Sequence, residues 1–467
     1  MTPQEYAARS ATQIAVLVRS REVTASQICE AALARLDTSL AGLNAITEVQ
    51  ADQARAAAAH LDQQGAPPTG ALAGVPVVLK EEAVQAGHVT TLGGHGNSTP
   101  EAADGELVRR LRAAGAVIIA RTTMPEFGQF PFTESIRYGV TRNPWDPSRS
   151  PGGSSGGSAV AVATGVAPIG LGADGGGSIR IPASACGLVG LKPTRGRVSL
   201  APLAQHWYGL VVAGGMTRTV ADSALLLDVI AGSTAVDRWQ WPAEQQPFVD
   251  QAAQDPAGLR VAWTTKPVTP GLHSDPQIES ATEEVARALT RIGHRVRRTE
   301  PRWPVPTDAF LPQFYGGMRA EAVSVEHPDR LEPRTRQTAK LGRWATPRVV
   351  EHALRRGEQV ADLFDTRLLT DTDVLVLPVM PRLPPPVGFL DGLDSVRAQV
   401  KTLPYVSNTV ISNVTGHPAI SVPAGVSVEG WPIGVQLIAR RGAEGLLLAV
   451  AAQLERELPW PHWTSSQ

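Results

Sequence analysis

The amino-acid sequence predicts an α/β fold with helices on both faces of a β-sheet. Two observations carry this prediction. Helical patterns that end at a glycine are followed by short runs of Val, Ile and Leu, and this alternation recurs along most of the chain. The 467 residues are 43% hydrophobic, which is enough to bury a large core. Length alone allows two or three domains, although large α/β enzymes often form one unit.

The first half of the chain gives clear signals for helices and strands. Residues 24–27 resemble a capping box, in which two side chains cap the first turn of a helix. In chain order, the predicted elements are a helix after this box, an alanine-rich helix over 50–61 ending near Gly65, a linker at 66–68, a buried strand over 75–79 ending on Lys80, a helix over 107–114 closed by Gly115, and a strand over 116–120.

The second half continues the alternation. It predicts helices over 219–230 and 276–292, and strands over 260–263, 373–378, 418–422 and 433–438. The stretch from about Pro301 to Leu393 is rich in Pro and Arg and gives the least regular signal, because proline disrupts helix interiors and central strands.

Charge and composition exclude several classes of protein. The formal net charge is −1, so no basic excess indicates binding to nucleic acid. Cys29 and Cys186 lie far apart, without the spacing of a disulfide framework or a zinc site, and we expect no metal and no organic cofactor. The N-terminus lacks the pattern of a signal peptide, and no stretch reaches the ~18 apolar residues of a membrane helix. We therefore expect a cytoplasmic protein that does not bind membranes.

The most informative stretch is Pro151 to Arg180. It holds two serine-bearing glycine clusters, 152–158 and 174–180, on either side of a small apolar segment. Glycine lets the backbone bend and approach other groups closely, and consecutive N–H groups can converge on an anion. A hydroxyl nucleophile among such donors suits acyl transfer, because the donors stabilise the oxyanion of the intermediate.

Three hypotheses compete for this stretch. A phosphate-binding loop would need a lysine after Gly157, which is absent. A nucleophile elbow would need a strand directly before Gly152, and the prolines there forbid one. A serine–lysine system remains, with Lys80 as the base, because burial at a strand end disfavours the ammonium form. Glu81 and Glu82 would oppose this if they turned inward, so we expect them to point elsewhere or to pair with other groups.

Long, ordered motifs then give a family resemblance. The chain resembles the amidase signature family of serine hydrolases over nearly its whole length. The motifs that carry the likeness are residues 74–80, 123–128, 143–146, 151–158, 170–180, 186–199, 416–423 and 432–437. The resemblance implies one large domain with a mixed, twisted central sheet, which we divide into an N-terminal helical segment (1–65), a catalytic core (66–232) and a remainder that completes the sheet and the substrate pocket (233–467).

The resemblance also implies the catalytic residues. Ser178 is the expected nucleophile, Ser154 the bridging serine next to an unusual cis peptide bond, and Lys80 the base. The expected oxyanion hole consists of the backbone N–H groups of Gly175, Gly176, Gly177 and Ser178. The expected reaction is hydrolysis of a carboxylic amide through an acyl-serine intermediate.

Other expectations concern the surroundings of this site. Asp174 and Arg180 are expected to form an ion pair or hydrogen-bond network that fixes the loop. Substrate contacts are expected from Met124, Phe127, Trp207 and Tyr208. The partner is a small-molecule amide, and a homodimer is possible by resemblance.

Two alternatives to a stand-alone amidase remain open. A glutaminase subunit of a tRNA-dependent amidotransferase is disfavoured, because residues 204–210 and 214–220 differ from the pattern of that subunit. An acyltransferase with the same three residues is harder to exclude.

The pair Glu81-Glu82 departs from the pattern of the amidase signature family, since the family usually has an Asp-Asn-like pair after the lysine.

Overall fold

The computed structural model describes residues 1–64, 66 and 68–463 and is built around one large sheet. Eleven strands follow the order β1-β3-β2-β6-β8-β7-β12-β13-β11-β9-β10, and β4 and β5 form a separate pair. The strands are β1 (Ile46–Val49), β2 (Pro76–Lys80), β3 (Val117–Thr122), β4 (Glu134–Ser135), β5 (Gly139–Val140), β6 (Ile169–Asp174), β7 (Val189–Lys192), β8 (Val212–Thr217), β9 (Arg260–Trp263), β10 (Arg295–Arg298), β11 (Val374–Pro378), β12 (Ala419–Val426) and β13 (Pro432–Ile438).

The sheet is mixed, and its parallel pairs place the site. Strand β2 is parallel to both β3 and β6, and β9 is parallel to both β10 and β11. The carboxyl ends of β2 and β6 therefore meet at one edge of the sheet. Lys80 ends β2 there, and the loop from Gly175 to Ser178 begins there after β6.

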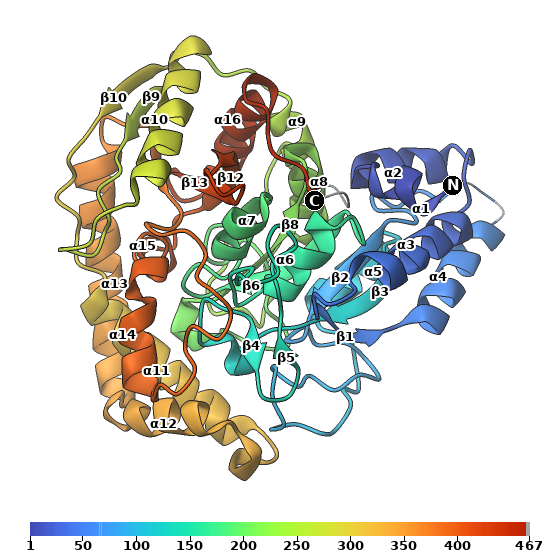
Figure 1. Ribbon diagram of the computed structural model, residues 1–467, viewed down its shortest axis with the longest axis horizontal. Coiled ribbons are helices and arrows are strands. Elements are labelled where there is room, and N and C mark those ends of the chain that lie inside the picture. Colours follow the sequence, from blue (N-terminus) through green and yellow to red (C-terminus); the bar gives the residue numbers. More distant parts are fainter. Residues whose placement is uncertain (65, 67, 464–467) are drawn as a thin grey trace.

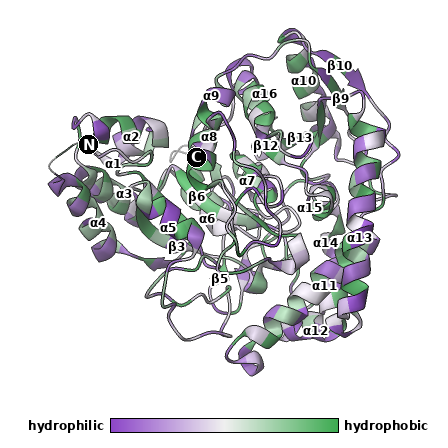
Figure 2. Cartoon of the chain, turned by 180° about the vertical axis from the view of Figure 1, so that it is seen from behind, coloured by the Kyte–Doolittle hydropathy of each residue, from purple (hydrophilic) through white to green (hydrophobic). Residues whose placement is uncertain are grey.

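Helices cover both faces of this sheet, as the sequence predicts. The α-helices are α1 (Pro3–Ala7), α2 (Ala11–Arg19), α3 (Ala25–Ser39), α4 (Ala51–Gln63), α5 (Glu106–Ala113), α6 (Gly156–Ala163), α7 (Arg180–Cys186), α8 (Val220–Ile230), α9 (Phe248–Ala252), α10 (Pro276–Arg291), α11 (Thr307–Ser324), α12 (Pro333–Leu341), α13 (Pro347–Phe364), α14 (Ser395–Val406), α15 (Val410–Thr415) and α16 (Glu444–Glu457). Figure 1 shows the N-terminal helices and helices α11–α14 on opposite sides of the molecule. Outer helices such as α4 and α13 carry both hydrophilic and hydrophobic residues (Figure 2), as expected where only one face packs inward.

Glycines in the strands let two helices approach opposite faces closely. A Cβ at Gly170 of β6 would lie 2.9 Å from Val162 of α6. A Cβ at Gly215 of β8 would lie 2.5 Å from Leu226 of α8. Gly170 pairs with Met216, so these two residues face the same side of the sheet. Gly215 is the neighbour of Met216 along β8 and therefore faces the opposite side. Helices α6 and α8 thus cover opposite faces, and α6 begins within the first glycine cluster.

Most predicted elements are confirmed within a few residues. Thr24 and Gln27 form the expected capping box at the start of α3. The helix predicted to end near Gly65 ends at Gln63. Gly65 itself, and Pro67 of the linker predicted at 66–68, lie outside the described residues.

The segment with the least regular signal is largely helical. It contains α11, α12 and α13. Proline is compatible with the first turn of a helix, where its missing N–H has no intrahelical partner. Pro333 and Pro347 each begin a helix, and only Pro312 lies inside one. Pro333 and Pro347 thus mark helix starts, whereas Pro301, Pro304 and Pro384 to Pro386 lie in irregular stretches.

Two further observations concern the chain as a whole. Cys29 and Cys186 are buried, and neither forms a disulfide. Across the described ranges, no helix combines the length and the apolar character needed to cross a membrane.

Candidate active site

Lys80 contacts Ser154 at the edge of the sheet where β2 ends. The Lys80 Nζ atom donates to Ser154 Oγ at 2.8 Å. The lysine side chain is 3% exposed and follows four fully buried residues of β2. The sequence folds in this way because 76–79 is apolar, so the strand enters the core and places a single amine at its end. Lys80 and Ser154 are therefore in the contact that a proton relay requires.

The loop that carries Ser154 is tightly enclosed. The Gly153–Ser154 peptide bond is cis, which agrees with the expectation from the resemblance. A Cβ at Gly153 would lie 2.8 Å from the backbone of Phe132, and a Cβ at Gly128 would lie 3.0 Å from Ser154 Oγ. Neither glycine can carry a side chain without displacing a neighbour.

The second loop, with Ser178, is tied to the first through the main chain. The Ser155 N–H donates to the Ser178 carbonyl at 3.2 Å. Thr409 Oγ1 donates to the Gly176 carbonyl at 2.5 Å. The Gly177 N–H donates to Asp174 Oδ1 at 2.7 Å, so this donor is already used inside the protein. Among the described residues, no acceptor takes a hydrogen bond from the N–H of Gly175, Gly176 or Ser178.

Asp174 and Arg180 form the buried network that the sequence predicts. Both side chains are fully buried, and Arg180 donates to the carboxylate at 2.9 and 3.0 Å. Burial alone would raise the pKa of Asp174, but the charge and hydrogen bonds of Arg180 and a hydrogen bond from Asn413 outweigh burial and hold this pKa far below its ordinary value. Arg180 also donates to Gln436 and Asn413. Neither of these partners follows from the sequence, because they come from segments more than 200 residues away.

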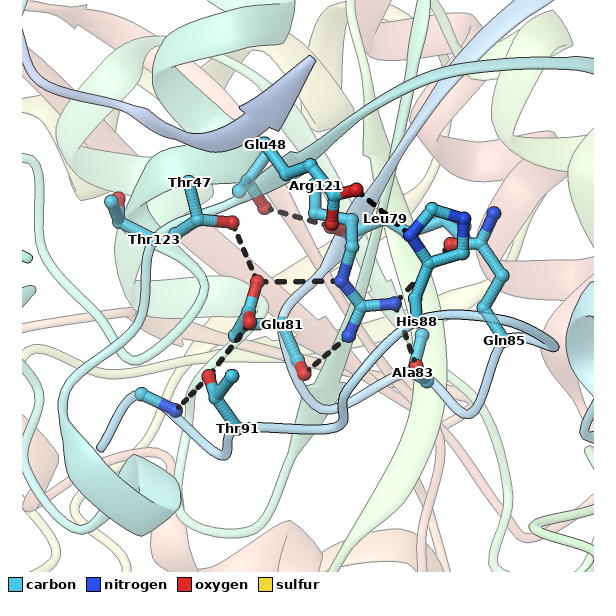
Figure 3. Close-up of polar contacts among 12 residues, drawn as sticks. Thr47, Glu48, Leu79, Glu81, Ala83, Gln85, His88, Thr91, Arg121 and Thr123 are labelled. Atoms are coloured by element: carbon cyan, nitrogen blue, oxygen red, sulfur yellow. Dashed lines mark hydrogen bonds and ion pairs between the residues drawn. The ribbon is translucent and has the colours of Figure 1, made fainter. Parts of the chain in front are cut away.

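Glu81 turns away from Lys80, as expected. Its carboxylate accepts hydrogen bonds from Thr47 at 2.5 Å and Thr91 at 2.7 Å, and Arg121 lies 3.4 Å from it. Figure 3 shows how these groups surround Glu81, with the Arg121 guanidinium also directed to the backbone carbonyls of the following turn. This buried network fixes the chain directly after Lys80.

The expectation for Glu82 is wrong. Glu82 Oε1 lies 2.9 Å from Lys80 Nζ, and the two side chains are 15% and 3% exposed. The contact is an ion pair without the angle of a hydrogen bond, and among the described residues Glu82 Oε1 accepts no hydrogen bond. The turn after β2 directs Glu82 back toward the amine, which the sequence pattern could not indicate.

A small cavity of about 50 Å³ lies beside Ser178. Its wall is mostly aromatic and aliphatic, and the described lining residues are Gly128, Gln129, Phe130, Pro131, Gly176, Ser178, Ile181, Trp207, Phe310, Phe314, Gln399, Thr402, Val406 and Val410. Trp207 packs edge-on against Phe314, with ring centroids 5.2 Å apart.

The four expected substrate-contact residues occupy different places. Trp207 borders this cavity, and Tyr208 borders a larger one beside Lys80. Met124 and Phe127 are buried at 1% and 2% exposure, and Phe127 belongs to the same apolar cluster as Trp207. Both Trp207 and Tyr208 have positive φ, 46° and 53°, a conformation that bulky side chains rarely adopt. Within the described ranges, no group of three His, Cys, Asp or Glu side chains could hold a metal ion.

Comparison with known proteins decides the family. A family model described as amidase matches residues 27–448. The chain belongs to the amidase signature family. This amidase is 42% identical to "Putative amidase AmiB2" of Mycobacterium tuberculosis, over 99% of each chain. The structure of a 6-aminohexanoate cyclic dimer hydrolase matches it with a TM-score of 0.89 at 34% identity, over 97% of each chain.

A second solved structure supports the same assignment. A bacterial aryl acylamidase of the amidase signature family matches with a TM-score of 0.86 at 27% identity, over 97% of this chain and 96% of the other. The fold and the sequence therefore agree, and the amidase is a hydrolase that acts on amides.

Proposed function

We propose that this amidase hydrolyses a carboxylic amide to a carboxylate and an amine or ammonia through an acyl-enzyme on Ser178. The observation that carries the proposal is the buried contact of 2.8 Å between Lys80 Nζ and Ser154 Oγ. It is supported by the main-chain bond from Ser155 to Ser178, which holds the two serine loops together.

The proposed first half-reaction forms the acyl-enzyme. The base is Lys80 in its neutral form, which the Glu82 carboxylate at 2.9 Å opposes. Lys80 in this form accepts the proton of Ser154 Oγ, Ser154 accepts the proton of Ser178 Oγ, and Ser178 Oγ attacks the amide carbon. The C–N bond then breaks, and the same relay returns the proton to the departing amine. A base that first accepts and then returns one proton needs no other titrating group.

The second half-reaction repeats this sequence with water. Water loses a proton through Ser154 to Lys80 and attacks the acyl carbon. The bond between the acyl carbon and Ser178 Oγ then breaks, the relayed proton returns to Ser178 Oγ, and the carboxylic acid that leaves releases its remaining proton to solvent as it becomes the carboxylate. In both steps the tetrahedral oxygen carries negative charge. We infer that the N–H groups of Gly175, Gly176 and Ser178 stabilise it, since the N–H of Gly177 is bound to Asp174.

The wall beside Ser178 favours an apolar acyl group. Phe130, Phe310 and Phe314 contribute aromatic surface, and Ile181 and Val410 contribute aliphatic surface. We therefore propose aromatic or aliphatic amides as the substrate class. Such a pocket binds by burying apolar area and discriminates only weakly between similar hydrocarbons.

Covalent labelling tests the nucleophile. The native enzyme should react with a fluorophosphonate probe and release amine from a panel of anilides and aliphatic amides. Ser178→Ala should lose both the label and the release of amine, whereas Ser155→Ala, one residue after the bridging serine, should keep the label. Retained labelling of Ser178→Ala would contradict the assignment. Added hydroxylamine separates hydrolysis from acyl transfer, because a transferase would form hydroxamate in preference to the free acid.

A further inference from the structure

The indole of Trp207 stands between two cavities. One is the cavity of about 50 Å³ beside Ser178, and the other is the larger cavity beside Lys80, with a volume of about 470 Å³. Of the described residues that line these cavities, only Trp207 borders both. Ser178 borders the smaller cavity alone, so the Trp207 side chain separates the nucleophile from the larger one.

The loop after β6 packs against this indole. Ala173 lines the larger cavity, and Gly176 lines the smaller one. Between them, a Cβ at Gly175 would lie 3.0 Å from the six-membered ring of Trp207. On α11, a Cβ at Gly317 would lie 2.6 Å from Cδ1 in the five-membered ring of the same side chain. The indole therefore fills the space between the loop and α11.

Helix α11 also holds the indole in this position through hydrogen bonds. Trp207 Nε1 donates to Glu321 at 3.1 Å, and His206 contacts the other oxygen of this carboxylate. Gln313, two turns before Glu321 on α11, donates to the Tyr208 carbonyl at 2.8 Å. The positive φ angles of Trp207 and Tyr208 are rare for bulky residues and persist only where neighbouring groups enforce them. The contacts with α11 supply this constraint.

The two cavities differ in what they can hold. A volume of about 50 Å³ has room for about three to five water-sized groups, which suits a short acyl group. The larger cavity is of a size typical of small-molecule sites. Its aliphatic wall includes Val84, Leu92, Leu107, Leu200 and Leu203, and Leu203 is 49% exposed at its rim. Space and apolar surface for a longer chain therefore lie on the far side of the indole from Ser178.

We propose that Trp207 determines the length of acyl group that the enzyme accepts. Its indole closes the cavity beside Ser178 against the larger cavity, so the native enzyme favours short acyl groups. Removal of the indole joins the two cavities and admits a longer aliphatic chain. This inference rests on the proposed acyl-enzyme at Ser178 and adds the residue that limits its substrates.

Steady-state kinetics with p-nitroanilides of increasing acyl length test this role. Butanoyl p-nitroanilide should be a better substrate of the native enzyme than octanoyl p-nitroanilide. The ratio of kcat/KM for octanoyl to kcat/KM for butanoyl should rise at least about tenfold in Trp207→Ala, because each newly buried CH₂ group raises kcat/KM up to about fourfold. The gain should appear mainly as a lower KM for octanoyl, since a remote chain is bound alike in the ground state and the transition state.

Further variants show whether the effect belongs to the Trp207 ring. Trp207→Phe keeps a ring at this position and should hold the octanoyl-to-butanoyl ratio within about threefold of the native ratio. Trp344→Ala removes an indole that is 48% exposed and borders neither cavity, and the ratio should not change. In the Trp207→Ala background, Leu200→Trp fills part of the larger cavity and should remove most of the gain. Trp207→Leu takes the place of Trp207→Ala if that variant does not fold.

Several results would overturn the proposal. A native enzyme that prefers octanoyl to butanoyl would contradict the limit on length, and so would an unchanged ratio in Trp207→Ala. An equal rise in Trp207→Phe or Trp344→Ala, or a gain that Leu200→Trp leaves intact, would place the longer chain outside the larger cavity. Failure of the proposed function is distinct from all of these, because Ser178→Ala would then still hydrolyse both anilides.

Discussion

Replacing Asp174 by asparagine should destabilise the protein through its buried partner Arg180. The carboxylate accepts hydrogen bonds from the Gly177 N–H at 2.7 Å, from the Arg180 guanidinium at 2.9 and 3.0 Å, and from Asn413 at 2.9 Å. The amide of Asp174→Asn keeps the shape of the side chain but removes its charge. A fully buried guanidinium then has no opposite charge.

The expected loss is large because the pair is buried. Removing one partner of a buried ion pair typically costs about 3–5 kcal/mol. A native domain has only about 5–15 kcal/mol of stability in total. The matched control is Asp373→Asn, whose pair with Arg260 has side chains that are 27% and 47% exposed. An exposed pair of this kind contributes about 0–1 kcal/mol.

Urea unfolding followed by tryptophan fluorescence measures both variants. Asp174→Asn should lower the midpoint strongly and Asp373→Asn only slightly. Fluorophosphonate labelling of Asp174→Asn should also slow, because the Asp174 carboxylate accepts a hydrogen bond from Gly177 in the loop that carries Ser178. Equal midpoints for Asp174→Asn and the native protein, or equal losses in the two variants, would refute the reasoning.

The same carboxylate predicts a pH dependence. The pKa of Asp174 is lower in the folded protein than in the unfolded chain. The ionised Asp174 carboxylate therefore contributes its full amount to the free energy of unfolding at pH values above the pKa of about 3.9 that aspartate has in the unfolded chain. This contribution is lost as the pH falls below that pKa. The stability difference between native protein and Asp174→Asn should be constant at neutral pH and should narrow below about pH 4.

Two further predictions follow from other buried groups. Lys80→Met should lower kcat/KM by about 10²–10⁴, as expected for loss of a general base, and should also lower the melting temperature, because the largely buried Glu82 loses its ion-pair partner; activity near that of the native enzyme would remove Lys80 as the base. Burial raises the pKa of Glu126 to about 7. Between about pH 4.5 and pH 7 the folded protein therefore keeps this carboxyl protonated while the unfolded chain has lost the proton, and the free energy of unfolding falls as the pH rises through this range. As the pH rises from 5 to 8, Glu126→Gln should therefore gain up to roughly 3 kcal/mol of stability relative to the native protein. Thermal melts at the two pH values measure this gain. If the difference in melting temperature between the variant and the native protein is the same at both pH values, Glu126 is not a buried group that titrates in this range.

Local patterns explain which parts of the fold the sequence could predict. The apolar run before Lys80 and the capping box at Thr24 act within a few residues, so both are visible without tertiary structure. Strand β6, which leads into the loop of Ser178, lacks such a pattern. Its glycines at 170 and 172 are poor strand formers, and they are explained only by the close approach of α6 and Ser155 from the neighbouring face.

The site shows the same division. The resemblance assigns Lys80, Ser154 and Ser178, and the structure brings Lys80 and Ser154 into contact. The use of the Gly177 N–H by Asp174 could not be predicted, because hydrogen bonding depends on the exact turn of the loop. The inward position of Glu82 was equally hidden.

What the sequence by itself determined is the class of fold, the family and the residues with reactive groups, because these follow from periodicity and from long motifs. Only the tertiary structure decided which groups meet. Lys80 has a carboxylate neighbour in Glu82, Arg180 is held by residues more than 200 positions away, and two cavities share the indole of Trp207. The physical reason is that hydrogen bonds and ion pairs act over a few ångströms in space, a distance that separation along the chain does not measure.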